Sequence, residues 1–178
     1  KNRQVGDTVQ FVFVGSVDAR KGIPFLLETW KEMNTDRAQL TLIGPVSADT
    51  EKFIRTNYPS VIVKGKLPFS EVKQSLPGYD VMIFPSFFEG FGLVIPEAMA
   101  SALPVITTTA TCGPDVMENG KDGFIIEPGD VQALRHSIEF FINTPAAIET
   151  FGKAAREKSV QLSWDAYGER WQKSLEEK

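Results

Sequence analysis

The sequence predicts an α/β domain, built on an open parallel sheet with helices on both faces. Six short apolar runs, rich in β-branched and aromatic residues, have the length and composition of strands that are buried on both sides. Segments with helical spacing separate these runs, and strands that alternate with helices form right-handed parallel βαβ units. Beyond Gly129 and Asp130 the sequence is helical throughout. We therefore expect a Rossmann-like sheet that is followed by helices.

The strands are expected at the apolar runs themselves, which are residues 10–14, 39–43, 61–63, 81–84, 104–107 and 123–126. Helices are expected between these strands, at residues 25–33, 51–57, 70–76 and 95–102. Ser70 is a suitable N-cap for the third of these helices, because its hydroxyl can accept a hydrogen bond from a free backbone N–H.

Three further helices are expected after the sheet, at residues 131–143, at 146–162 and from Ser163 onward, with Pro145 and Ser163 at the breaks. The last of them carries a narrow apolar stripe at helical spacing, formed by Trp164, Tyr167, Trp171 and Leu175. We interpret this stripe as the face with which the helix docks on its own domain.

Composition excludes several classes of function. The 19 Lys and Arg against 23 Asp and Glu give a net charge of -4, which argues against a broad basic face for nucleic acid or an anionic membrane. The single cysteine and single histidine can form neither an internal disulfide nor a zinc site, so a reducing compartment is expected. No apolar run approaches the roughly 20 residues of a membrane-spanning helix. The 178 residues suit one domain, and the start at Lys1 indicates part of a longer protein.

The first segment that could bind a ligand is the loop at residues 15–22, which directly follows the first expected strand. Backbone N–H groups and the cations of Arg20 and Lys21 could hold a phosphate there. Neither a G-x-G-x-x-G nor a Walker sequence is present, which argues against a dinucleotide dehydrogenase or an NTPase. From the residues alone, the basic pair fits a solvated turn better than a phosphate clamp, because exposed basic pairs are common in loops.

The second segment joins the strand at 81–84 to the next helix and carries two glycines and two carboxylates. Gly90 and Gly92 let the main chain approach a ligand closely. Glu89 and Glu97 stand eight positions apart, so we expect both to face one cleft, where carboxylates accept hydrogen bonds from sugar or ribose hydroxyls. Close to a helix N-terminus they are expected to stay ionised. Glu97 could instead serve only to complement the helix dipole.

Two other features receive no functional role. The threonine-rich residues 107–111 are expected to satisfy their hydroxyls locally, and Cys112 is expected to be a packing residue because no basic partner would activate it. His136 lies in the middle of an expected helix, away from the strand ends, and is interpreted as a surface residue.

The E-x7-E spacing of Glu89 and Glu97, with the continuation EAMASALPVI, strongly resembles the retaining glycosyltransferases of family 4, which have the GT-B fold. The likeness extends over nearly the whole chain, because further segments match in order at residues 63–67, 79–86, 119–124 and 128–130. The resemblance implies that residues 1–178 are one nucleotide-sugar-binding domain, the C-terminal half of a two-domain enzyme.

The resemblance also implies roles for individual residues. Glu97 would bind the ribose hydroxyls, Glu89 the hydroxyls of the transferred sugar, and Lys21 the diphosphate. Backbone amides facing the sugar and diphosphate would come from Gly90, Phe91, Gly92 and Leu93. The turn lining the nucleobase would be Gly65, Lys66 and Leu67. The loop after the first strand would contribute Gly15 and Ser16, and Arg20 would replace the arginine that family members often carry at the position of Ser16.

The predicted function is therefore sugar transfer, of the hexosyltransferase type, from a nucleotide-diphosphate sugar to an acceptor hydroxyl in bacterial surface polysaccharide synthesis. The resemblance implies no metal or other cofactor and no nucleic acid partner. It implies a cytoplasmic enzyme, at the inner face of the membrane where the acceptor is lipid-linked. The acceptor would be held by an N-terminal half, so this domain alone is expected to be inactive. Two alternatives remain at this point: a non-catalytic nucleotide-binding module, and a glycoside hydrolase that uses Glu89 and Glu97.

Overall fold

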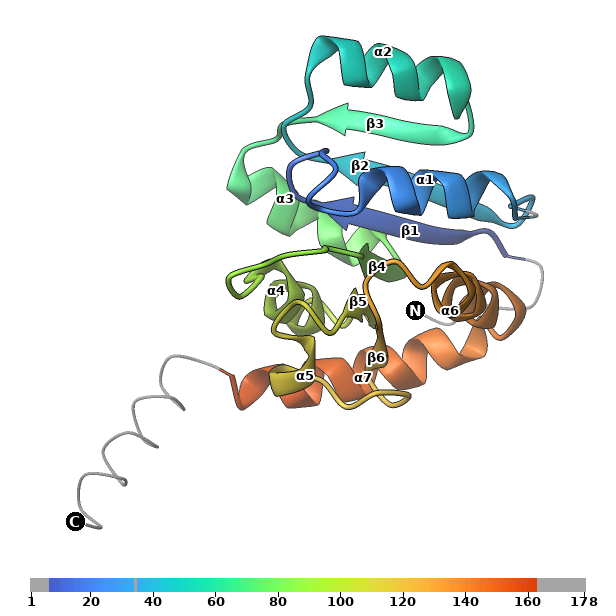
Figure 1. Ribbon diagram of the computed structural model, residues 1–178. Helices are drawn as coiled ribbons and strands as arrows, with labels where there is room; N and C mark the ends of the chain where they lie inside the picture. The colour runs from blue at the N-terminus through green and yellow to red at the C-terminus, as the bar shows by residue number, and fades with distance from the viewer. Residues whose placement is uncertain (1–6, 34, 163–178) are drawn as a thin grey trace.

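The computed structural model describes residues 7–33 and 35–162, and it contains a six-stranded sheet in the order β3-β2-β1-β4-β5-β6 (Figure 1). The strands are β1 (Val9–Val14), β2 (Ala38–Ile43), β3 (Val61–Gly65), β4 (Val81–Phe84), β5 (Val105–Thr108) and β6 (Gly123–Ile126). Every neighbouring pair is parallel. The predicted open parallel sheet is confirmed, with strand boundaries within two residues of the expected ones.

Helices separate the strands and close the described part of the chain (Figure 1). They are α1 (Ile23–Lys31), α2 (Ala48–Asn57), α3 (Phe69–Ser75), α4 (Val94–Ala100), α5 (Gly113–Val116), α6 (Val131–Asn143) and α7 (Ala146–Val160), with a 3-10 turn η1 (Leu76–Gly78) after α3. Helix α1 contacts α6, and α4 contacts α7. In Figure 1, α1 lies in front of β1 and α3 behind it, so helices cover both faces of the sheet as predicted.

The burial of the central strands explains why apolar runs in the sequence located them correctly. All four residues of β4 and all four residues of β5 are buried, as expected of central strands between two helical layers. The stacked rings of Phe13 and Phe84, with centroids 5.9 Å apart, join β1 to β4 in the middle of the sheet. The core therefore lies directly beneath the strand ends that carry the candidate loops.

Helices α2 and α3 begin earlier than the apolar spacing predicted, α2 by three residues and α3 by one. Helix α2 begins three residues early, at Ala48, because the Ser47 hydroxyl accepts from the Thr50 N–H at 3.2 Å and caps it. The prediction that Ser70 is an N-cap is wrong. Helix α3 already begins at Phe69, so Ser70 lies inside the helix. The N-cap position is Pro68, which makes no side-chain hydrogen bond. The short helix α5, with Pro114 in its first turn, was not predicted.

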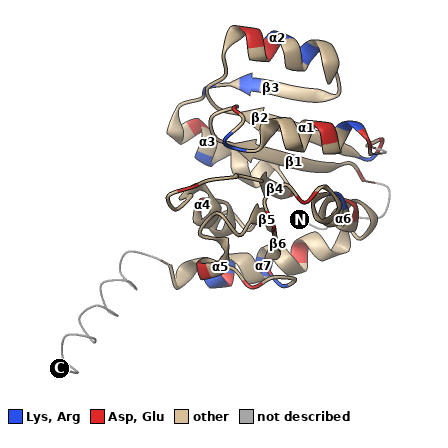
Figure 2. Cartoon of the chain, in the orientation of Figure 1, with Lys and Arg blue, Asp and Glu red and all other residues tan. Residues whose placement is uncertain are grey.

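Both signs of charge occur on helices α1 and α2 (Figure 2). Within residues 7–33 and 35–162, no helix is long and apolar enough to cross a membrane. The expected final helix from Ser163, with its apolar stripe of Trp164, Tyr167, Trp171 and Leu175, lies outside the described residues.

Four phenylalanines form a compact aromatic cluster where β6, α6 and α7 meet. They are Phe124, Phe140, Phe141 and Phe151, and their ring centroids lie 5.2–5.7 Å apart. Phe141 is fully buried and contacts all three of the others. Edge-to-face pairs of this kind add to the free energy gained by burying the rings.

Phe141→Ala should lower the free energy of unfolding by about 3–5 kcal/mol, because it removes a buried ring and leaves a cavity among three others. Urea unfolding followed by circular dichroism measures the effect. The control is Val160→Ala, at a side chain that is 68% exposed on α7, which should cost less than about 0.5 kcal/mol. Equal losses in both variants would contradict this account of the core.

Candidate functional site

A cleft of about 810 Å³ lies at the carboxyl ends of the first four strands. Strand order reverses between β1 and β4, and in open α/β sheets the loops diverge at such a point and leave a crevice for a ligand. Most of the candidate residues line this cleft, namely Gly15, Ser16, Arg20, Lys21, Lys66, Leu67, Glu89, Phe91, Gly92, Leu93 and Glu97. Gly65 and Gly90 are not among its lining residues.

Lys21 lines the cleft and connects the loop after β1 with the loop after β4. Its side chain is 11% exposed, its Nζ lies 5.1 Å from the ring centroid of Phe84, and it forms an ion pair with Glu89. A buried ammonium that contacts both Glu89 and the Phe84 ring is not exposed to solvent. The interpretation of the basic pair as a solvated turn is therefore wrong for Lys21. It fits its neighbour Arg20, which is exposed at the same loop.

Asp18 fixes the shape of the β1–α1 loop. Its Oδ1 accepts from the Lys21 N–H at 3.0 Å, and its Oδ2 accepts from the Ser16 hydroxyl at 2.7 Å. Partial burial by itself raises the pKa of Asp18. The Ser16 hydroxyl, the Lys21 amide and the charges of Arg20 and Lys21 outweigh burial and hold the pKa below 3.8. The ionised carboxylate of Asp18 therefore stabilises the conformation of this loop.

Because its pKa is lowered on folding, Asp18 contributes stability above about pH 4, and this contribution is lost as the pH falls through the folded pKa. Asp18→Asn should therefore lower the urea midpoint at pH 7 and should flatten its decline between about pH 5 and pH 3. Ser16→Ala removes one of the two hydrogen bonds, so its urea midpoint should lie between those of the wild type and Asp18→Asn. A variant Asp18→Asn with the wild-type slope would show that the carboxylate does not hold the loop.

Glu89 uses both carboxylate oxygens within the chain. Its Oε2 pairs with Lys21, and its Oε1 accepts from the Gly90 N–H at 3.2 Å. Gly92 has φ +90°, and a Cβ there would lie 3.2 Å from the Cγ of Glu89. The loop is further anchored by the Cys112 N–H, which donates to the Phe91 carbonyl at 2.8 Å. Glycine at position 92 thus permits the turn that brings Glu89 to Lys21.

Glu97 lies in the first turn of α4, is half-buried and lines the same cleft. Burial raises its pKa above 4.5, more than the nearby charge of Lys73 lowers it. Burial therefore acts against the helix terminus, which is expected to favour the ionised form of Glu97. A raised pKa on one glutamate is also what a glycoside hydrolase requires, but the second glutamate of such a pair, Glu89, is bound to Lys21.

Several cleft residues were missed by sequence analysis. Phe69 and Val72 on α3 line the cleft beside Leu67, and Phe69 is 66% exposed. Pro45, after β2, also contributes to the lining. The signal was present, because Phe69 and Val72 stand at helical spacing directly after the 65–67 turn. An exposed phenylalanine beside a ligand cleft offers a stacking surface.

The residues that were given no role are placed as expected. The buried hydroxyls of Thr107 and Thr108 donate to the carbonyls of Phe84 and Ser86, at 2.9 and 2.5 Å. Burial raises the pKa of the Cys112 thiol to about 11, so the thiol is unreactive at neutral pH. His136 is exposed on α6. In the part of the chain that the structure describes, no three His, Cys, Asp or Glu side chains gather as metal ligands.

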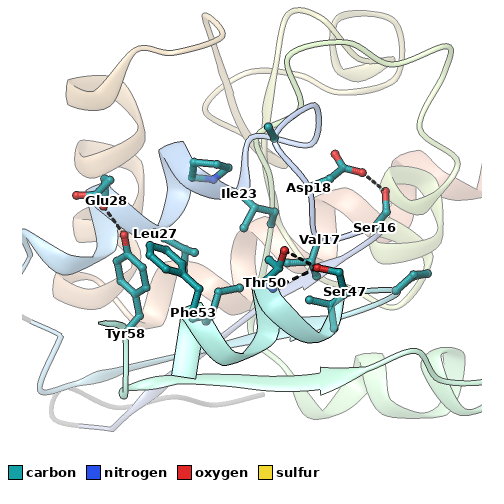
Figure 3. Close-up of a pocket in the computed structure, with 15 residues that line it drawn as sticks. Ser16, Val17, Asp18, Ile23, Leu27, Glu28, Ser47, Thr50, Phe53 and Tyr58 are labelled. Carbon is teal, nitrogen blue, oxygen red and sulfur yellow. Dashed lines mark hydrogen bonds between the residues drawn. The ribbon is translucent and has the colours of Figure 1, made fainter. Parts of the chain in front are cut away.

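A second cavity, of about 640 Å³, lies between α1 and α2 (Figure 3). Its walls are mainly apolar, with Ile23 and Leu27 on one side and Phe53 on the other. Its charged lining residues are Asp18 and Glu28, and the Tyr58 hydroxyl donates to Glu28. The charged side chains that line this cavity are all acidic, whereas the first cleft combines its two glutamates with Arg20, Lys21 and Lys66, so charge favours the first cleft as the anion site.

Residues 8–144 match the family of glycosyl transferases group 1. Among characterised relatives, the sulfoquinovosyl transferase SQD2 of Arabidopsis thaliana is 33% identical over 158 residues, which cover 87% of this chain and 31% of the relative. The capsular polysaccharide biosynthesis glycosyltransferase CapM of Staphylococcus aureus is 31% identical over 179 aligned positions, which cover 92% of this chain and 46% of CapM.

Solved structures agree with the fold. Sucrose-phosphate synthase of Thermosynechococcus elongatus superposes with a TM-score of 0.81 at 25% identity, covering 99% of this chain and 48% of that protein. Anabaena Alr3699/HepE in complex with UDP superposes with a TM-score of 0.82 at 20% identity, covering 98% of this chain and 50% of that one.

The chain thus spans 31% and 46% of the length of these two relatives. The sheet order, the helices that follow it and the half-length matches confirm the prediction of a C-terminal GT-B half. Since the family match extends over most of the chain, this protein is a member of the glycosyl transferases group 1, which are the glycosyltransferases of family 4.

Proposed function

We propose that residues 1–178 form the donor-binding domain of a retaining hexosyltransferase, which moves a sugar from a nucleotide-diphosphate sugar to an acceptor hydroxyl. The observation that carries the proposal is the convergence of one buried ammonium and two carboxylates on the cleft at the strand-order reversal. The acceptor would be bound by an N-terminal half, which is also where a membrane-associated or lipid-linked acceptor would be held, on the cytoplasmic side.

The proposed chemistry depends on charge at the leaving group. As the bond between the sugar and the diphosphate breaks, negative charge gathers on the phosphate oxygens, and Lys21 with Arg20 would stabilise it. Backbone N–H groups of residues 90–93 would add uncharged donors. The acceptor oxygen would attack from the face that the diphosphate leaves, and a phosphate oxygen would take the acceptor's proton. The carboxyl end of the sheet then needs no separate protein base for this transfer.

The remaining donor parts would fill the two ends of the cleft. Glu97 would accept hydrogen bonds from the ribose hydroxyls, and Glu89 from the transferred sugar. The nucleobase would lie at the Gly65–Leu67 turn, where Phe69 and Val72 supply an apolar surface. The relative CapM is named for capsular polysaccharide biosynthesis, and Alr3699/HepE has been crystallised with UDP and with UDP-glucose. These names support polysaccharide synthesis as the setting and UDP-glucose as the first donor to test.

A thermal-shift panel tests the proposal. It pairs UDP with UDP-glucose, GDP with GDP-mannose and ADP with ADP-glucose. A ligand present at 100 times its Kd stabilises the folded state by about 2.7 kcal/mol. For a domain of this size that corresponds to a rise in Tm of roughly 5–10 °C. We expect one base to give this rise. The absence of any rise with all six compounds at millimolar concentration would contradict the proposal.

Glu97→Gln should weaken the nucleoside diphosphate and the nucleotide sugar equally, by about 10- to 100-fold, because both contain the ribose that Glu97 would hold. Isothermal titration calorimetry measures both affinities. Glu149→Gln, at an exposed residue in the first turn of α7, is the matched control and should leave both affinities unchanged. Loss of affinity for the nucleotide sugar alone would place Glu97 at the sugar and reverse the proposed order of the cleft.

A further inference from the structure

The ion pair between Lys21 and Glu89 joins two of the loops that line the cleft, those after β1 and β4. The residues are 68 positions apart, and their side chains are 11% and 14% exposed. Each partner also has a second anchor. The ammonium of Lys21 lies over the Phe84 ring, and Oε1 of Glu89 accepts from the Gly90 N–H. Each side chain can therefore keep its place in the cleft when the other takes a new partner.

A nucleoside diphosphate that binds Lys21 must compete with Glu89 for the same ammonium. Its phosphate oxygens carry negative charge, and they would stand beside a carboxylate that has lost its cation. Like charges repel strongly in a partly buried site, and a carboxylate that is left unpaired there is costly. Repulsion by Glu89 would therefore lower the affinity of the cleft for a free nucleoside diphosphate.

A nucleotide sugar resolves this conflict with its own hydroxyl groups. Sugar hydroxyls are hydrogen-bond donors, and a carboxylate accepts such bonds with both oxygens. The Glu89 that is displaced from Lys21 by the diphosphate gains a partner only when the sugar is still attached. The same carboxylate thus opposes the product and is satisfied by the substrate.

We propose that Glu89 is a selectivity residue, which exchanges Lys21 for the donor sugar and so lets the cleft prefer the nucleotide sugar over the free nucleoside diphosphate. This inference rests on the proposed function, because it requires a diphosphate at Lys21. It adds a second effect to the sugar contact of Glu89: the side chain weakens the product complex and favours product release after transfer.

A different role for the pair would give a different result. If Glu89 only held Lys21 in position, its removal would misplace the ammonium, and both ligands would bind less tightly. If exchange occurs, neutralising Glu89 should have opposite effects on the two ligands. The two roles are therefore separated by the sign of one affinity change.

The test is calorimetry of Glu89→Gln with UDP and UDP-glucose, or with the GDP or ADP pair if the panel identifies that base. Exchange predicts that the nucleoside diphosphate binds about tenfold tighter than to the wild type, because a like charge has gone. The nucleotide sugar should gain nothing or bind less tightly. The preference for the sugar-bearing ligand should therefore fall at least about tenfold.

Two further variants keep the result interpretable. In Lys21→Met the added effect of Glu89→Gln on the nucleoside diphosphate should be smaller, since no ammonium remains to compete for. Glu51→Gln breaks the exposed ion pair of Glu51 with Arg55 on α2 and should change neither affinity. An equal loss for both ligands in Glu89→Gln, or an unchanged preference, would overturn the inference while leaving the proposed function intact. A wild-type chain that binds none of the six compounds would instead overturn the proposed function itself.

Discussion

The chain of residues 1–178 should bind a nucleotide sugar and transfer none of it to an acceptor. In the proposed enzyme the donor lies in the cleft between β1 and β4, but the acceptor would be held by a second domain facing these strand ends. Without that domain the cleft is open to water, so any donor that is cleaved should be hydrolysed slowly rather than transferred. A transfer assay with the donor found by the thermal-shift panel measures the difference.

The comparison is between this chain and the same residues fused to the proposed acceptor-binding N-terminal half. Transfer should be undetectable in the first and robust in the second. Multiple-turnover transfer by residues 1–178 alone would contradict the division between donor and acceptor halves. No transfer by the longer protein, despite tight donor binding, would support a non-catalytic nucleotide-binding module. Sugar release without any requirement for a nucleotide would support a hydrolase.

Lys21→Met should give the largest loss of affinity of any single substitution in the cleft, about 10- to 100-fold for both nucleoside diphosphate and nucleotide sugar. Methionine keeps much of the buried stem and removes the ammonium, which is the cation held between Phe84 and Glu89. Calorimetry at low salt measures the effect.

Arg20→Ala is the informative neighbour. Arg20 lines the same cleft but is exposed, so its contribution should be smaller and should fall as salt is added. Lys153→Met, at a side chain that is 78% exposed on α7, is the control for loss of a lysine and should change nothing. Wild-type affinity in both Lys21→Met and Arg20→Ala would show that the β1–α1 loop does not hold the diphosphate.

Much of the fold could be predicted because the strands lie between two layers of helices. Residues buried on both faces are mostly apolar, as all four residues of β4 are, and such runs are visible in the sequence. Helix starts were harder to predict, because they are decided by single capping contacts. Ser47 begins α2 ahead of its first buried residue, and Pro68 rather than Ser70 precedes α3.

The candidate site was predictable where it is local in sequence and not where it depends on tertiary contacts. The glycines between Glu89 and Glu97 indicated a turn beside a ligand, and both acids do line one cleft. The partnership of Glu89 with Lys21 could not be predicted from spacing, since the two stand 68 positions apart on loops after β1 and β4. The raised pKa of Glu97 likewise depends on burial, which its position in the first turn of a helix does not reveal.

A crystal structure of residues 1–178 with the nucleotide sugar identified by the panel tests the central claim most directly. The account predicts that the diphosphate lies in the cleft between β1 and β4, with a phosphate oxygen within hydrogen-bond distance of Lys21 Nζ. It also predicts that the ribose hydroxyls donate to Glu97 and that a sugar hydroxyl donates to Glu89. A diphosphate bound in the groove between α1 and α2, or bound in the first cleft without contact to Lys21, would contradict it.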